Sequence, residues 1–141
     1  MNLEMIAAGS LETKPEALLN EMRQLRDNPV FGFDRLIDLT AVDRGETFEL
    51  VYRLNSLLHD RDLLVRAKVS LEQPTIASVS EIWESALFGE REVHDMFGIV
   101  FEGHPELEPL LAPEEGFGFF PLRKSYTLPG RSGQTDGGNG R

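Results

Sequence analysis

Two segments in the middle of the chain alternate apolar and polar residues, and this alternation limits the fold more than any other feature. The apolar positions are Phe48, Leu50, Tyr52 and Leu54 in the first segment, and Leu63, Val65, Ala67, Val69 and Leu71 in the second. Successive side chains of a strand point to opposite faces, so each segment predicts a strand with one buried face. With a β-prone run over residues 36–42 and turns near 43–46 and 57–61, they predict an antiparallel meander.

Helical patterns flank this predicted sheet. The first helix is expected to be capped by Thr13, to hold Pro15 in its first turn and to end at residues 27–29. The second is expected to start with a capping box at residues 78–81 and to run to Gly98. A sheet with one apolar face needs cover. The predicted fold is therefore α+β, a small antiparallel β-sheet covered on one face by helices.

The 141 residues suffice for one ordinary domain. We expect a flexible N-terminus over residues 1–12, the α+β domain over 13–98, an extended Pro/Gly/Phe-rich docking tail over 99–129 and a disordered C-terminus over 130–141. Three phenylalanines, Phe117, Phe119 and Phe120, are spread among the glycines of the tail. Two packing partners stay open for such a segment, the domain's own sheet and another subunit.

Composition excludes several classes of function. The chain has no cysteine, which removes disulfides and thiolate ligands for zinc or iron–sulfur clusters. Its net charge of -10 disfavours nucleic acid and anionic lipid. Neither an apolar run long enough to span a bilayer nor a secretory signal is evident, so the sequence predicts a cytosolic location. Glycine-rich phosphate loops, dinucleotide fingerprints and catalytic triads are also absent from the sequence.

Charged residues interrupt the apolar stripe of the second helix. Glu90 falls between Leu87 and His94 on the stripe, so its carboxylate is expected on the covered side, where it needs a partner. Arg91, Glu92 and Asp95 fall outside the stripe. We predict that Arg123 from the tail pairs with Glu90 or Glu92.

Two catalytic readings of the same residues stay open from sequence alone. Glu90 and His94 stand at i and i+4, and with His104 they could hold a metal ion in a soluble metal-dependent enzyme. Glu90 with Glu92 as an acid–base pair is disfavoured, because residues two apart on a helix point to different sides. A stand-alone binding module is a third possibility.

The stretch 78–126 resembles the 30 kDa subunit of respiratory complex I, the enzyme known in bacteria as NADH:quinone oxidoreductase. The family signature is met by Glu90, Arg91, Glu92, Asp95, Met96, Phe97 and His104, with Gly98, Pro105, Pro121, Leu122, Arg123 and Lys124 around it. Two positions depart from the pattern, Glu108 and Ser125, and both lie in the tail. Related subunits occur in energy-converting hydrogenases, which stay an alternative.

This resemblance implies a non-catalytic structural subunit in the peripheral arm of a complex I-like oxidoreductase, on the cytoplasmic side of the membrane. Its partner would be the large 49 kDa-type subunit, against which the tail would run. It would hold no cofactor of its own. Iron–sulfur clusters, with flavin or nickel–iron, are expected in partner subunits.

Overall fold

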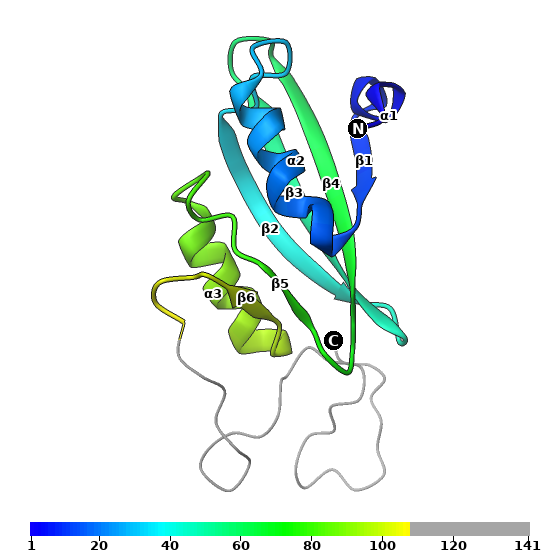
Figure 1. Cartoon of the computed structure of the whole chain (residues 1–141), viewed down its shortest axis with the longest axis vertical. Coiled ribbons are helices and arrows are strands. Elements are labelled where there is room, and N and C mark those ends of the chain that lie inside the picture. Colours follow the sequence, from blue (N-terminus) through cyan, green and yellow to red (C-terminus); the bar gives the residue numbers. More distant parts are fainter. Residues whose placement is uncertain (108–141) are drawn as a thin grey trace, which may run out of the picture.

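The computed structural model describes residues 1–107, and its centre is a four-stranded sheet in the order β1-β4-β3-β2 (Figure 1). Strands β2 (Arg35–Asp43), β3 (Thr47–Ser56) and β4 (Arg61–Ser70) form the predicted antiparallel meander. The predicted alternation is confirmed, since Phe48, Leu50, Tyr52 and Leu54 are all 0% exposed. The sheet therefore has one apolar face that other elements must cover.

Two helices cover that face. Helix α2 (Pro15–Asp27) lies across the sheet in Figure 1 and buries Leu18, Met22 and Leu25. Helix α3 (Ala86–Phe97) contacts β2, and its Phe97 ring meets Phe48 of the apolar face edge-on, with ring centroids 5.6 Å apart. The predicted α+β fold, with helices on one face of a small sheet, is confirmed.

The N-terminal segment contains regular structure that the sequence does not predict. Helix α1 (Leu3–Ala8) begins where the Asn2 side chain accepts backbone N–H groups of Glu4 and Met5. Strand β1 (Ser10–Thr13) then pairs in parallel with β4. The strand buries only Leu11 deeply, so it shows no period in the sequence. Thr13 ends this strand and does not cap α2, whose N-cap position is taken by Lys14 without a side-chain cap.

The start of the second helix was also predicted wrongly, whereas its end was right. Residues 78–85 form turns, and α3 begins only at Ala86 and ends at Gly98, which has φ +82°. The Ser78 hydroxyl donates to Glu90 and accepts the Ser80 N–H, and the residues after it form turns in place of a first helical turn. The predicted capping box is therefore a turn.

A second, two-stranded sheet flanks α3. Strand β5 (Thr75–Ala77) pairs in parallel with β6 (Val100–Glu102), which lies in the segment predicted to be extended. The β5 strand is too short to show a period, and it precedes the residues expected to start a helix. We call residues 71–107, which contain β5, α3 and β6, the α3 lobe.

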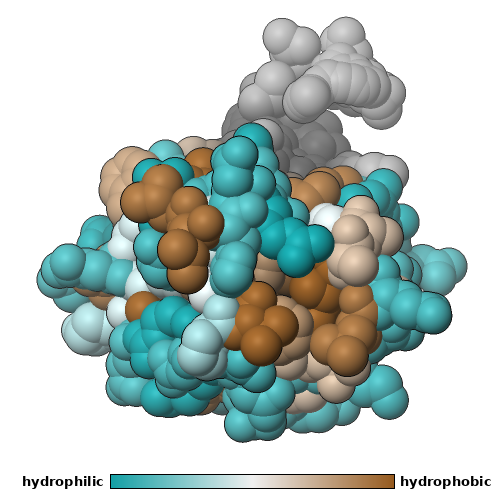
Figure 2. Space-filling model, turned by 90° about the horizontal axis from the view of Figure 1, so that it is seen from above, coloured by the Kyte–Doolittle hydropathy of each residue, from teal (hydrophilic) through white to brown (hydrophobic). Residues whose placement is uncertain are grey.

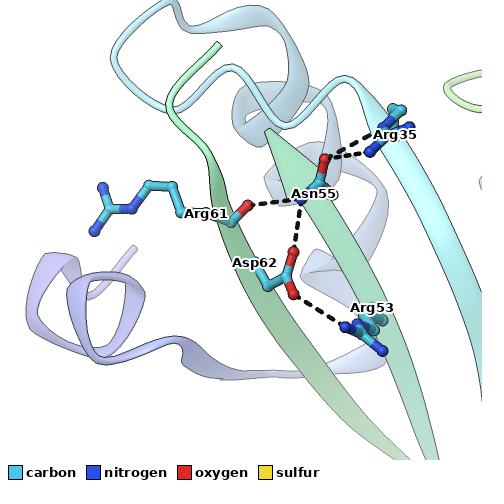
Figure 3. A network of polar contacts seen from close by, with 5 residues as sticks. All are labelled: Arg35, Arg53, Asn55, Arg61 and Asp62. Atoms are coloured by element: carbon cyan, nitrogen blue, oxygen red, sulfur yellow. Dashed lines mark hydrogen bonds and ion pairs between the residues drawn. The ribbon is translucent and has the colours of Figure 1, made fainter. Parts of the chain in front are cut away.

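The other face of the four-stranded sheet carries a polar network near one end (Figure 3). The Asn55 side-chain oxygen accepts from the Arg35 guanidinium at 3.2 and 2.8 Å, and its amide nitrogen donates to Asp62 at 2.7 Å and to the Arg61 carbonyl at 3.3 Å. Arg53 donates to Asp62 at 3.1 Å. Polar side chains bonded to one another in this way allow the face to stand in water without a covering helix.

Several predictions concern residues beyond this description. The docking tail over 99–129 falls within it only up to residue 107, and the C-terminal stretch 130–141 lies outside it entirely, as do Glu108 and Ser125. Within residues 1–107, no helix is long and apolar enough to cross a membrane.

Candidate functional site

Glu90 is the first residue of the signature and is 0% exposed, as its place on the apolar stripe predicts. The Ser78 hydroxyl donates to one carboxylate oxygen at 2.6 Å, and the Val79 backbone N–H donates to the other at 2.8 Å. Both donors come from the turn that follows β5. Glu90 therefore ties α3 to the start of the α3 lobe through hydrogen bonds to a charged group, which are stronger than neutral ones.

Burial dominates the titration of this carboxyl group. The pKa of Glu90 is raised because burial penalises its charged form, while the bonds from Ser78 and Val79, and the charge of a protonated His104, act in the opposite direction. The Tyr52 hydroxyl is also buried, and burial together with the Glu90 charge raises the pKa of Tyr52 well above its ordinary value. Within residues 1–107 this hydroxyl has no hydrogen-bond partner.

The predicted ion pair of Glu90 or Glu92 with Arg123 lies outside the described residues and stays a prediction. Ser78 and Val79 already satisfy one lone pair on each Glu90 oxygen. Sequence reasoning interpreted Ser78 as a helix cap and so missed its contact with Glu90. A serine twelve residues before a buried acid gave no local signal of this contact.

The two histidines of the signature region also bind backbone groups. His94 is bonded through Nδ1 to the Ile99 carbonyl at 2.9 Å, across the end of α3. His104 accepts the Glu106 N–H at Nδ1, so in its neutral form it carries its proton on Nε2 and donates to the Leu87 carbonyl, 2.9 Å away. Both ring nitrogens of His104 are therefore occupied.

The side chains of Glu90, His94 and His104 all have hydrogen-bond partners within the chain, so a metal ion is not needed to explain why they are buried. Each side chain fastens a neighbouring segment to α3. In the described part of the chain, no group of three or more His, Asp or Glu side chains is placed to hold a metal. The geometry supports a structural role for all three residues.

The remaining signature residues of α3 divide between core and surface. Phe97 is buried, and Gly98 ends the helix with its N–H donating to the His94 carbonyl at 2.8 Å. Arg91, Glu92, Asp95 and Met96 are exposed, as is Pro105 after β6. The other members of the predicted set, Pro121, Leu122, Arg123 and Lys124, lie outside the described residues.

One exposed residue was missed by the sequence analysis. Phe88 on α3 is 70% exposed, beside Gly89, which lies so close to β2 that an added Cβ would stand 3.3 Å from the Leu39 Cβ. Gly89 thus permits a close helix–strand contact and leaves the ring of Phe88 in solvent. The signal for this was the glycine within a helical pattern.

Comparisons with known proteins agree with this arrangement. The family described as "Respiratory-chain NADH dehydrogenase, 30 Kd subunit" matches residues 11–132. A subunit of the NADH-quinone oxidoreductase of Roseiflexus castenholzii is 40% identical over 122 residues, covering 84% of this chain and 70% of that protein. Subunit 5 of the Thermus thermophilus oxidoreductase is 45% identical over 109 residues, covering 69% and 52%.

Two solved structures share the fold. The trypsin-resistant fragment of Nqo5 is 34% identical, with a TM-score of 0.65 over 74% of this chain and 95% of that one. A chain of the archaeal membrane-bound sulfane sulfur reductase is 27% identical, with a TM-score of 0.72 over 85% of this chain and 72% of that one. The family match over residues 11–132 includes β2, β3, β4, α3 and the signature, and the chain belongs to the family of the 30 kDa subunit of respiratory-chain NADH dehydrogenase.

Proposed function

We propose that this chain is a non-catalytic subunit of the peripheral arm of a complex I-like NADH:quinone oxidoreductase, where it braces the large 49 kDa-type subunit. One observation carries the proposal. The ionisable signature residues that could perform chemistry, Glu90, His94 and His104, are buried and bonded to the chain's own segments. The other charged signature residues of α3, Arg91, Glu92 and Asp95, are on the surface.

The exposed half of the signature supports a binding role. Arg91, Glu92 and Asp95 project from α3, and Met96 beside them is 41% exposed. Charged side chains around an apolar one are the usual composition of a polar rim with an apolar contact. Rigid packing of α3 through Gly89 and Phe97 would hold this surface in one orientation.

Redox chemistry would then belong to neighbouring subunits. The chain has no cysteine with which to hold an iron–sulfur cluster. In this proposal iron–sulfur clusters and flavin reside in partner subunits, and the chain sits on the cytoplasmic side as a peripheral member of a membrane complex. Its contribution is to position the large subunit during electron transfer coupled to proton translocation.

A charge reversal on the exposed face of α3 tests the proposal. We expect Glu92→Lys to lower the amount of subunit in the assembled complex, and the NADH:quinone reductase activity of membranes, by about fivefold or more. Glu46→Lys, an exposed acid in the β2–β3 turn, is the matched control and should leave both unchanged. Full assembly and activity of the Glu92→Lys and Asp95→Lys double variant would refute the bracing role.

A second candidate is the equivalent subunit of a related membrane-bound complex, such as an energy-converting hydrogenase. It is favoured by the likeness to the archaeal sulfane sulfur reductase complex. The large subunit that co-purifies with the chain separates the two. Two Cys-x-x-Cys pairs able to bind nickel in that subunit would establish the hydrogenase reading, and their absence would favour the quinone reductase.

A further inference from the structure

A hollow lies between the start of β2 and the turn that leads into α3. Residues 34–37 form one side and residues 82–85 the other, and its volume is about 380 Å³. Leu36, Ile82 and Trp83 are almost fully buried and form its apolar lining. The hollow therefore has room for a side chain, and its lining combines these apolar residues with the polar residues Asp34, Arg35, Glu84 and Ser85.

Hydrogen bonds hold both sides of this hollow in place. The Ser85 hydroxyl donates to the Leu36 carbonyl at 2.8 Å, and the Trp83 indole N–H donates to the Phe33 carbonyl at 3.1 Å. Arg26 of α2 donates to the Ile82 carbonyl at 3.0 Å. A site fixed in this way needs little reordering when a partner binds, which lowers the entropic cost of binding.

Exposed apolar side chains stand next to the hollow. Ile37 on β2, one of the lining residues, is 47% exposed. Phe88 in the first turn of α3 is 70% exposed and follows the lining residue Glu84 by four positions, a spacing that puts two side chains on the same side of a helical turn. At the other end of the hollow, Asp34 accepts the N–H of Leu57, which is 66% exposed in the β3–β4 turn. Figure 2 looks onto the end of the molecule that holds this turn, where apolar side chains gather in several places between hydrophilic ones.

The charge around the hollow defines the chemistry of a partner. The α3 lobe contains eight Asp or Glu residues and only one basic residue, Arg91. Glu84 and Asp34 lie on the two sides of the hollow, and no ion pair of either is found within residues 1–107. Arg35, the one cation among the described residues that line the hollow, is turned to Asn55 on the solvent face of the sheet. A second copy of the chain would bring another net charge of -10 and be repelled.

We propose that this hollow, with Phe88 and Ile37 at its edge, binds a segment of the large subunit in which Lys or Arg stands next to a large apolar side chain. The apolar side chain enters between β2 and the 82–85 turn. The basic group pairs with Glu84 and Asp34. This inference rests on the proposed function and names the chemistry of the partner surface.

Affinity between the purified full-length chain and the 49 kDa-type subunit of the same complex tests the proposal. Phe88→Glu removes the apolar edge and puts a charged group where the partner's apolar side chain would pack, and Glu84→Lys reverses the charge that faces the basic group. We expect each to weaken binding by about tenfold or more. The matched control is Leu3→Glu, because Leu3 is 64% exposed on α1, beside the opposite edge strand β1; its affinity should stay within about twofold. Binding of the unmodified chain should also weaken as salt rises.

Each other outcome overturns the inference. If the unmodified chain binds and Phe88→Glu and Glu84→Lys bind equally well, the hollow is not the contact, although the proposed function stands. Absence of any binding by the unmodified chain overturns both. A loss of more than about 5 °C in the melting temperature of isolated Phe88→Glu would show that the chain's own segment fills the hollow. A dimer that dissociates in this variant would assign the surface to a second copy.

Discussion

The solvent face of the four-stranded sheet and the α3 lobe both carry many charged residues, but they use them differently. On the sheet, Arg53 pairs with Asp62 at 3.1 Å and Arg44 pairs with Glu49 at 2.7 Å. In the α3 lobe, Glu81 is the one acid with an ion pair inside the described residues, to Arg23 of α2. Two acids of the sheet are thus paired with cations of the sheet and its turns, whereas the lobe presents a surplus of exposed acids.

This difference separates charges that serve the fold from charges that serve a partner. A charged face that is satisfied internally gains little from binding another protein, because its ion pairs would have to be broken or desolvated. Exposed acids without counter-ions gain from a basic partner. Within the lobe, burial makes the same distinction, since Glu90 is bonded inside the fold and Glu92 two residues later is exposed.

The largest expected effect comes from Glu90→Ala. The substitution leaves the Ser78 hydroxyl and the Val79 N–H without their buried acceptor and opens a cavity under α3. We expect the free energy of unfolding to fall by about 2–4 kcal/mol. Glu92→Ala, on the exposed side of the same helix, should change it by about 0.5 kcal/mol or less. Urea unfolding measures both, and equal losses would remove the contrast between the buried and exposed acids.

A smaller effect concerns pH. Because the pKa of Glu90 is raised in the folded chain, its protonated form favours folding; this contribution is present below the ordinary value of 4.5 and is lost as pH rises through the raised pKa. Glu90→Gln has no such loss, so we expect it to become more stable relative to the unmodified chain as pH rises from about 4 to 7.

The comparison uses the difference between the two unfolding curves, in which the remaining titratable groups largely cancel. Tyr52 and His104 are the titratable groups coupled electrically to Glu90. A difference that stays constant with pH would show that the Glu90 carboxyl has the same pKa in the folded and the unfolded chain, and would contradict the prediction.

The smallest effect is expected on the sheet. Arg53 and Asp62 side chains are 54% and 48% exposed, so Arg53→Ala should shift the melting temperature by no more than about 3 °C. The hydrogen bond from Asn55 is the largest cause of the lowered pKa of Asp62, and the bond from Arg53 is the second. Asp62 therefore keeps its Asn55 partner in the Arg53→Ala variant. Arg44→Ala should lower the melting temperature more than Arg53→Ala does, because the Glu49 side chain is 7% exposed and loses its ion-pair partner. A shift for Arg53→Ala as large as that for Glu90→Ala would contradict the comparison.

Much of the sheet could be predicted from the sequence because its signal is local. Alternation over Phe48–Leu54 identifies a strand and its buried face without knowledge of its neighbours. Strands β1 and β5 could not be found in this way, since they are held by parallel partners distant in the chain, β4 and β6. Pairing of that kind leaves no pattern in three or four residues.

The sequence by itself determined the fold class, the burial of Glu90, the exposure of Arg91, Glu92 and Asp95, and the family. These follow from periodicity and from a long signature, both of which are properties of consecutive residues. Only the tertiary structure decided that Ser78 binds Glu90 and does not cap a helix, that His94 and His104 bind backbone carbonyls, and that Phe88 is exposed on α3. The hydrogen-bond partners of these side chains are distant in the sequence or lie in the backbone, and only folding brings them within bonding distance. Residue type and spacing alone could therefore not assign these hydrogen bonds.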